Sequence, residues 1–312
     1  MKKPRILTVG STNMDFVCTA ARLPGAGETL LSEGDYFTAP GGKGANGAVA
    51  AARLGADVVF CTCVGKDAYG KQLFDTYAKE GIDGRFIFFD SDAKTGLAQI
   101  FRTDDGENRI TVFPGANRSL RAENVEEAFT CYPDAVLMQC EIEPEVVAYA
   151  ARTASDEGIP LFFDLAPMRR DFDPSIIPAC EILSPNESEA EFYTGIHLSD
   201  EESCLRAAMK LYAMVPCKYV VIKRGSLGCY IYDGTYREII PALKVRPVDT
   251  TGAGDSFTAA LTVRYLLNGG DIMDAARFAN CVGAYSVTVS GAFASFPTTA
   301  KLEAFINDYN RR

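Results

Sequence analysis

The 312-residue sequence predicts an α/β fold, in which a mostly parallel central sheet carries helices on both faces and a small separate β-sheet is attached. Three observations predict it. From residue 120 onward, short apolar runs alternate with segments of helical spacing. Residues 16–38 and 95–113 interrupt this order with apolar–polar alternation. Two glycine-rich stretches each lead directly into an apolar helical segment.

Composition and charge narrow the functional classes. Hydrophobic residues make up 47% and charged residues 23%, which is ordinary globular composition. The net charge of −10 argues against a nucleic-acid-binding surface, which needs clustered lysine and arginine. The ten cysteines are scattered, and Cys61 and Cys63 have no second pair or histidine nearby for a zinc site. Residues 1–10 lack the apolar core of a signal peptide and no run reaches membrane-spanning length, so we expect a cytoplasmic protein without a membrane partner.

Residues 5–10 form the first predicted strand, an apolar run that ends at a glycine. Small polar residues follow at 11–15, just past the carboxyl end of that strand, where open α/β sheets bind ligands. Asn13 and Asp15 can hydrogen-bond sugar-type hydroxyls, and their alternate spacing points both side chains the same way. An Asx-turn that closes the strand is the alternative interpretation.

The next stretch predicts the small sheet. Residues 16–38 alternate weakly around a turn at 24–28, and residues 95–102 and 109–113 alternate around Asp104-Asp105-Gly106. Together they predict about four strands, which we interpret as a lid formed by residues 14–38 and 95–113 on a single domain spanning 1–312. Two unrelated surface hairpins are the alternative.

Between the two lid segments, the glycine-rich stretch 40–47 leads into an alanine-rich helix that ends at Gly55. Its glycines permit a ligand to approach the backbone closely, and Lys43 and Asn46 can hydrogen-bond hydroxyls. The spacing differs from that of a Walker A phosphate loop.

The remaining elements follow in regular order. The predicted strands are 57–64, 134–139, 159–164, 181–184, 218–223 and 229–232, and the predicted helices are 69–79, 124–130, 144–157, 188–194, 201–214, 253–268, 271–289 and 298–309. Polar residues follow several of these strands. Each alone could cap a helix or close a turn, but their recurrence at one sheet edge predicts a cleft there: Glu141, Asp164, Asn186, Glu189 and Lys223.

The stretch 249–257 carries the strongest chemical signal. Gly252 and Gly254 permit a tight turn at the start of a helix, whose unpaired N–H groups and dipole suit a phosphate. Asp255 lies within this anion site, where a carboxylate can take a proton from a hydroxyl that attacks the phosphate. The alternative is a plain loop in which the aspartate caps the helix.

With both glycine-rich stretches in place, the chain resembles the ribokinase-like (PfkB) family of sugar and nucleoside kinases. The resemblance covers essentially the whole chain and rests on GGKGAN at 41–46, NESE at 186–189 and DTTGAGDSF at 249–257. It implies an ATP-dependent kinase for a primary hydroxyl of a pentose, with D-ribose as the first expectation. Another small sugar, a sugar acid or a nucleoside is the alternative substrate, and a non-catalytic sugar-sensing protein is the alternative of another class. The resemblance also implies Mg²⁺, a monovalent cation such as K⁺, and a homodimer that pairs two lids.

The resemblance assigns each site residue a role. Asp255 would be the base, and the N–H groups of Gly252, Ala253 and Gly254 would form the anion hole. The sugar would be held by Asn13, Asp15, Gly41, Gly42, Lys43, Asn46 and Glu141. ATP and Mg²⁺ would be bound by Asn186, Glu189, Lys223, Gly225, Ser226, Gly228 and Asn280. The monovalent cation would be bound by Asp249, Thr251, Ser286, Val289, Gly291 and Ser295.

Three departures from the family pattern concern the sugar and the phosphates. Gly47 replaces the glutamine that is common after GGKGAN, Asp164 stands where asparagine is usual, and Lys223-Arg224 replaces a Thr-Leu pair.

Overall fold

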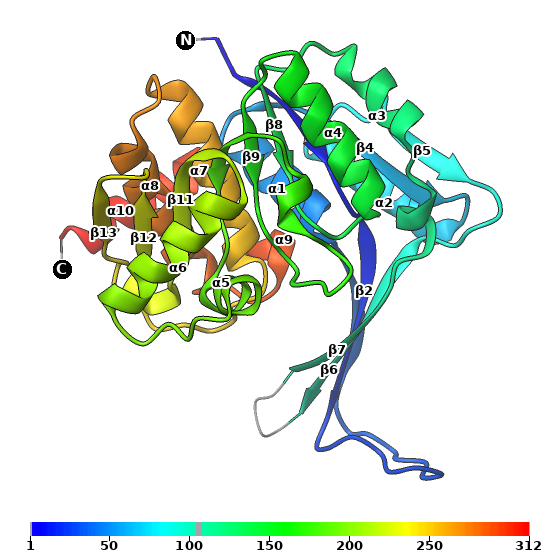
Figure 1. The fold of residues 1–312 in the computed structure, drawn as a ribbon. Coiled ribbons are helices and arrows are strands. Elements are labelled where there is room, and N and C mark those ends of the chain that lie inside the picture. The colour runs from blue at the N-terminus through cyan, green and yellow to red at the C-terminus, as the bar shows by residue number, and fades with distance from the viewer. Residues whose placement is uncertain (1, 104–107, 312) are drawn as a thin grey trace.

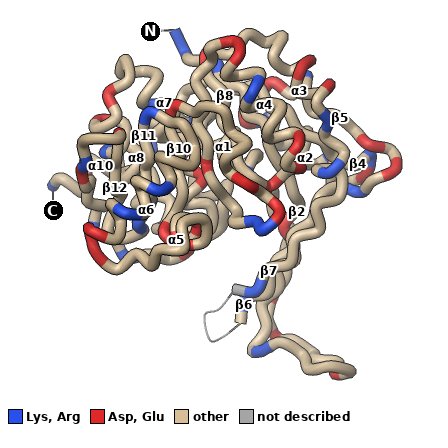
Figure 2. Tube along the Cα trace, viewed as in Figure 1, with Lys and Arg blue, Asp and Glu red and all other residues tan. Residues whose placement is uncertain are grey.

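The computed structural model of the protein describes residues 2–103 and 108–311 (Figure 1). The turn predicted at Asp104-Asp105-Gly106 lies outside the described residues. Figure 2 shows charged residues of both signs spread along the whole trace, so the net charge of −10 is not concentrated in one block. Among the described residues, no helix has the length and apolar character needed to cross a membrane.

A nine-stranded sheet forms the centre, in the order β13-β12-β11-β10-β9-β8-β1-β4-β5. The strands from β11 to β5 are parallel, whereas β12 and β13 continue the sheet antiparallel. The strands are β1 (Arg5–Val9), β4 (Asp57–Gly65), β5 (Ile87–Asp90), β8 (Ala135–Met138), β9 (Leu161–Phe163), β10 (Cys180–Leu183), β11 (Cys217–Lys223), β12 (Cys229–Tyr232) and β13 (Arg237–Ile240).

Helices cover both faces of this sheet (Figure 1). One layer contains α1 (Lys43–Arg53), α2 (Ala68–Lys79), α7 (Ala253–Leu267), α8 (Ile272–Ser286), α9 (Ala292–Ser295) and α10 (Thr299–Tyr309), and the other contains α3 (Ala122–Phe129), α4 (Pro144–Asp156), α5 (Glu187–Thr194) and α6 (Glu201–Met214). Short 3₁₀ turns lie at Gly115–Ser119, Pro174–Ile176 and Gly225–Leu227.

The two helical layers explain the apolar character of the strands. In β1, Ile6 packs into one core and its neighbour Leu7 into the other, and both side chains are fully buried. A strand covered on both faces must be apolar at consecutive positions, which is why the parallel strands read as continuous apolar runs. The predicted α/β fold is confirmed.

A separate four-stranded sheet projects from the α/β body (Figure 1). Its order is β3-β2-β6-β7, with β2 (Asn13–Ala20), β3 (Tyr36–Gly41), β6 (Gly96–Thr103) and β7 (Asn108–Phe113). The central pair β2–β6 is parallel and the outer pairs are antiparallel. The two segments that interrupt the strand–helix order therefore pair with each other, and the alternative of two unrelated hairpins is wrong.

The strand order reverses beside β1, because the chain first builds outward through β4 and β5 and later through β8 toward β13. A crevice outside the carboxyl ends of the strands is expected at such a switch point. Residues 10–12, which join β1 to the small sheet, lie at this point, so the fold places the start of that sheet beside the expected ligand site. The sequence did not predict β5 or β13, which are both short edge strands of four residues.

Candidate active site

The turn before α7 has the geometry that its glycines predict. Gly252 adopts a left-handed conformation (φ 76°, ψ −1°), and a Cβ there would lie 2.9 Å from the Phe296 ring, so glycine is required. The helix that follows is 15 residues long, and its N-terminal N–H groups and dipole favour an anion. The Ala253 N–H donates to the Thr250 carbonyl at 3.2 Å, a long bond that a phosphate oxygen could replace.

Asp255 lies in the first turn of α7, and its side chain is 8% exposed. The Asn46 Nδ2 donates to Asp255 Oδ2 at 2.6 Å, and the Lys43 ammonium lies 3.6 Å from Oδ1. Asp255 raises the pKa of Lys43 above its ordinary value, so the lysine stays charged. The Asn46 Oδ1 is buried without a hydrogen-bond partner in the described chain, which leaves a strong acceptor free beside the carboxylate. The two glycine-rich stretches of the sequence thus meet at Asp255.

A second group of polar residues borders the start of α1. The Glu141 Oε2 accepts hydrogen bonds from the Ser11 hydroxyl at 2.5 Å and from the Lys43 backbone N–H at 3.0 Å. The Asn13 Oδ1 accepts from the Asn117 Nδ2 at 2.8 Å, and Asn117 also bonds the backbone of residue 12. These bonds fix the predicted sugar-binding side chains before any ligand is present.

The Asp15 carboxyl has a raised pKa. Burial raises its pKa to about 7, and the nearby Glu141 and Asp255 carboxylates add to the effect. A Cβ at Gly41 would lie 2.2 Å from the Asp15 carboxylate, so the glycine makes room for this side chain. Three carboxylates therefore converge on one small region, and a ligand rich in hydroxyl donors would relieve their repulsion.

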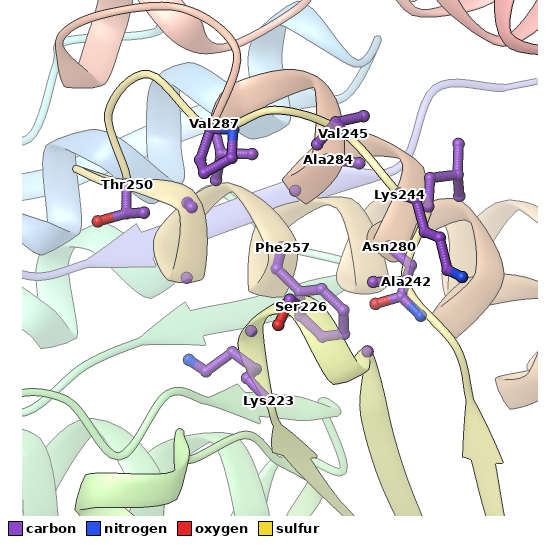
Figure 3. A pocket seen from close by; sticks show the side chains of 17 residues that line it. Lys223, Ser226, Ala242, Lys244, Val245, Thr250, Phe257, Asn280, Ala284 and Val287 are labelled. Atoms are coloured by element: carbon purple, nitrogen blue, oxygen red, sulfur yellow. The ribbon is translucent and has the colours of Figure 1, made fainter.

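A cavity of about 500 Å³ opens on the other side of the α7 turn. Figure 3 shows side chains that line it, including Lys223, Ser226, Phe257 and Asn280. It contains five of the seven predicted nucleotide residues: Lys223, Gly225, Ser226, Gly228 and Asn280. The Asn280 amide donates to the carbonyls of residues 240 and 241, at 2.9 and 3.3 Å, which holds it at the cavity wall. Ala253 and Gly254 line the same cavity, so the turn separates it from Asp255 and the sugar residues.

Asp164 and Lys223, two departures from the family pattern, form one buried ion pair. The Lys223 ammonium lies 2.7 and 2.6 Å from the two Asp164 oxygens, and the Thr258 hydroxyl donates to Asp164 Oδ2 at 2.7 Å. Their side chains are 9% and 1% exposed. The same ammonium lies 3.7 Å from the position that a Cβ on Gly254 would occupy, so a positive charge stands directly beside the α7 turn. The two substitutions are complementary, because each one supplies the partner that the other requires.

Asn186 and Glu189, the other two predicted nucleotide residues, do not line the cavity but stand at the start of α5. Asn186 caps the helix by accepting from the Glu189 N–H at 2.8 Å, and Glu189 accepts from the Asn186 N–H at 2.7 Å. Burial raises the pKa of Glu189 to about 7, and Asp164 adds to this rise while Lys223 opposes it. The carboxyl is therefore poised to ionise when a cation approaches.

Four of the six residues predicted for a monovalent cation lie on two adjoining loops, while Ser286 ends α8 and Ser295 ends α9. Several of their polar groups bind one another. The Asp249 Oδ1 accepts from the Thr251 N–H and hydroxyl at 2.9 and 2.6 Å, and Oδ2 accepts from the Gly291 N–H at 2.9 Å. The Arg102 guanidinium lies 2.9 Å from the same Oδ2 atom. Burial opposes the ionisation of Asp249, but the bonds from Thr251 and Gly291, with the charge of Arg102, lower its pKa to about 2.

The two serines of this group also form hydrogen bonds within the protein. The Ser286 and Ser295 hydroxyls lie 2.7 Å apart and share a hydrogen bond, and Ser295 also donates to the Ala292 carbonyl at 2.7 Å. Val289 donates its N–H to the Ser286 carbonyl at 3.2 Å. The predicted ligands converge, but the carboxylate already has a cationic partner.

Several site residues were not predicted. Asn117 follows the small sheet in a 3₁₀ turn, and only its position after a strand could have indicated it. Lys244, Val245 and Val287 line the nucleotide cavity from segments without a motif. Gln139 explains the third departure, because a Cβ at Gly47 would lie 3.2 Å from its amide nitrogen, so the Gln139 side chain fills that space.

Residues 3–299 match the pfkB family carbohydrate kinase profile. The chain belongs to this family. The predicted family membership is confirmed, and the chain is therefore an ATP-dependent carbohydrate kinase.

Individual members are similar over nearly their full length. A ribokinase from Haemophilus influenzae is 37% identical over 305 residues, which cover 97% of this chain and 98% of that protein. The structure of ribokinase from Giardia lamblia has a TM-score of 0.89 at 29% identity and covers 99% of this chain and 100% of its own. The structure of Arabidopsis thaliana ribokinase complexed with ribose and ATP has a TM-score of 0.88 at 30% identity and covers 98% and 99%. The architecture of the pfkB kinases therefore extends through both the large and the small sheet.

Proposed function

We propose that the protein transfers the γ-phosphate of ATP to the 5-hydroxyl of D-ribose, with Asp255 as the base. One observation carries the proposal: Asp255 stands between two predicted substrate sites, in contact with Asn46 and Lys43 on one side and one residue from the nucleotide cavity on the other. The similarity to a ribokinase complexed with ribose and ATP supports D-ribose over other small sugars.

In the proposed reaction, the sugar hydroxyl oxygen forms a bond to the γ-phosphorus while the bond from that phosphorus to the β,γ-bridging oxygen breaks, which releases ADP. The hydroxyl proton passes to the Asp255 carboxylate and then to solvent. The N–H groups of Gly252, Ala253 and Gly254 would stabilise the charge on the transferring group. The Lys43 ammonium lies 3.6 Å from Asp255 Oδ1, beside the carboxylate that would accept the proton.

The sugar would lie between α1 and the small sheet. The free Asn46 Oδ1 and the crowded Asp15 and Glu141 carboxylates are acceptors for its hydroxyl groups, and the Asn13 amide is held in place for another. Gly41 and Gly42 would help to shape the sugar site, because their missing Cβ atoms make room for the Asp15 carboxylate and for the backbone of residues 12 and 13. We also propose that the residue 14–38 and 95–113 segments act as a lid on the single domain spanning 1–312.

ATP would bind in the 500 Å³ cavity with its base near Asn280 and its phosphates near Lys223 and the α7 turn. Glu189 would hold Mg²⁺, because a cation would stabilise the charged form of this carboxyl, whose pKa burial raises to about 7, and the Asn186 N–H orients it. When bound through water, Mg²⁺ neutralises phosphate charge. We include no K⁺ in the reaction, because Arg102 already neutralises Asp249.

Two further proposals concern the oligomeric state and the cellular compartment of the enzyme. The small sheet exposes apolar side chains on β3 and β7, including Phe37, Ile110 and Phe113 (46%, 59% and 56% exposed), so we propose a homodimer in which two lids cover one another. The ten scattered cysteines, all of them free thiols here, favour a reducing compartment, and we propose the cytoplasm.

The proposal is tested by measuring ADP formation and the sugar phosphate product with purified protein, ATP and Mg²⁺. The acceptors would be D-ribose, 2-deoxyribose, fructose, 2-keto-3-deoxygluconate and nucleosides. We expect the highest kcat/KM for D-ribose and no turnover when EDTA removes Mg²⁺. A higher kcat/KM for another acceptor would refute D-ribose as the substrate. Absence of turnover with every acceptor, together with sugar binding, would favour a sensing protein.

A further inference from the structure

An arginine of the small sheet reaches the loop that precedes the anion-binding turn. Arg102 lies near the end of β6, and its Nη2 atom is 2.9 Å from Asp249 Oδ2, across 147 residues of sequence. The Asp249 side chain is 9% exposed and that of Arg102 is 27% exposed, so the pair is shielded from much of the solvent. Asp249 stands three positions before Gly252, the first residue of the turn. A positive charge is thus held beside the proposed phosphate site.

The Asp249 carboxylate has no remaining capacity for a metal ion in this arrangement. A carboxylate offers about four lone-pair positions. Thr251 supplies two donors to Oδ1, while the Gly291 N–H, the Ser290 hydroxyl at 3.3 Å and Arg102 surround Oδ2. A monovalent cation would have to displace the guanidinium, since the two positive charges would compete for the same oxygens.

The neighbouring groups support the same conclusion. The N–H groups of Val248 and Asp249 both donate to the Val287 carbonyl, at 2.7 and 3.2 Å, so the two loops are joined directly by backbone hydrogen bonds. The Ser286 and Ser295 hydroxyls bond each other. The loop therefore keeps its conformation through protein groups, and Arg102 provides the charge.

We propose that Arg102 is a built-in replacement for the monovalent cation that the pfkB resemblance implies at Asp249. This inference rests on the proposed kinase function. Because Arg102 belongs to β6, its charge arrives with the small sheet and not from solution. Movement of that sheet away from the body would remove the charge from the loop, so sheet position and the anion site are coupled.

Cation binding, thermal stability and turnover are compared in KCl and in tetramethylammonium chloride at equal ionic strength. Direct binding is followed with Tl⁺, a spectroscopic K⁺ analogue, by ²⁰⁵Tl NMR. For the wild-type protein we expect the same melting temperature and kcat in both salts and no saturable Tl⁺ signal. Arg102→Met, which removes the charge and keeps the length, should gain a saturable Tl⁺ site and a K⁺-specific rise in melting temperature of about 4 °C at 100 times the dissociation constant. Arg102→Lys, which keeps the charge, should behave as the wild type.

A saturable Tl⁺ site or a K⁺-specific rise in melting temperature in the wild-type protein would overturn the inference, as would an Arg102→Met protein that folds and does not respond to K⁺. If Arg102→Met does not fold, the wild-type Tl⁺ and K⁺ measurements alone decide whether the inference stands. A failure of this inference is distinguishable from failure of the proposed function, because ribose-dependent ADP formation is measured separately and continues in the first case.

Discussion

Replacing Asp15 by asparagine should stabilise the ligand-free protein at alkaline pH, although it removes a proposed sugar contact. Asp15 has an ordinary pKa of 3.8 that burial, with Glu141 and Asp255, raises to about 7. Between about pH 4 and pH 7, the folded state therefore holds a proton that the unfolded state has released. Stability then falls as pH rises through this window, and the full cost is present above pH 7.

The size of the effect follows from the shift. A rise of about 3 units at about 1.4 kcal/mol per unit gives an upper bound of about 4 kcal/mol, and local relaxation reduces it to about 2–4 kcal/mol. The Asp15→Asn amide is neutral at every pH and nearly isosteric, so it avoids this cost. We expect Asp15→Asn to exceed the wild type in free energy of unfolding by this amount at pH 8.5, with little difference at pH 4.

The measurement is urea unfolding of both proteins at several pH values without sugar. Asp171→Asn is a matched control, because a hydrogen bond from Arg169 lowers the pKa of Asp171 to about 2. Asp171→Asn removes an exposed carboxylate that Arg169 stabilises, so the control protein should be equal to or less stable than the wild type at pH 8.5. An Asp15→Asn protein that is no more stable at pH 8.5, or equally more stable at pH 4, would refute the reasoning.

The same pKa predicts how sugar binding depends on pH. The ionised Asp15 carboxylate accepts stronger hydrogen bonds from hydroxyls than the protonated carboxyl does, so ribose affinity should fall as pH drops below 7, and binding at pH 6.5 should release a proton. Titration calorimetry in buffers of different ionisation enthalpy detects that proton. Asp15→Asn should bind ribose at least 10-fold more weakly and show no buffer dependence, a loss of about 1.4 kcal/mol or more.

Three other predictions follow from named contacts. Asp255→Asn should lower kcat by about 10²–10⁴-fold and leave ATP affinity within a few-fold of the wild type, and near-normal turnover would contradict the base assignment. Asp164→Ala leaves the buried Lys223 ammonium without its partner and should lower the free energy of unfolding in urea by about 3–5 kcal/mol. The neutral double variant Asp164→Asn/Lys223→Thr should lose less, and an equal or greater loss would contradict the ion-pair interpretation. The exposed Ile110 lies in the proposed dimer surface, so Ile110→Asp should convert a dimer into a monomer in sedimentation equilibrium, and a monomeric wild type at micromolar concentration would count against the dimer.

Local sequence patterns predicted much of the fold. The apolar runs predicted the buried parallel strands because a strand covered on both faces has no solvent side to make polar. The glycines of the α7 turn predicted a tight turn, and Gly252 makes it in the left-handed conformation that glycine favours. The edge strands β5 and β13 escaped prediction because four residues at a sheet edge have too little alternation to distinguish them from loop.

The sequence by itself determined the family, the reaction class and the positions of the two glycine-rich turns, because motifs of six to nine residues specify backbone conformation and chemistry locally. The sequence presented Asp164 and Lys223 as two separate departures from the family pattern. Only the tertiary structure showed that they form one buried ion pair, although they lie 59 residues apart. The sequence assigned Asp249 to a cation, and only the tertiary structure placed Arg102 on its carboxylate. Which charges meet depends on how strands and helices pack across the sheet, and no local pattern encodes a partner that lies 147 residues away.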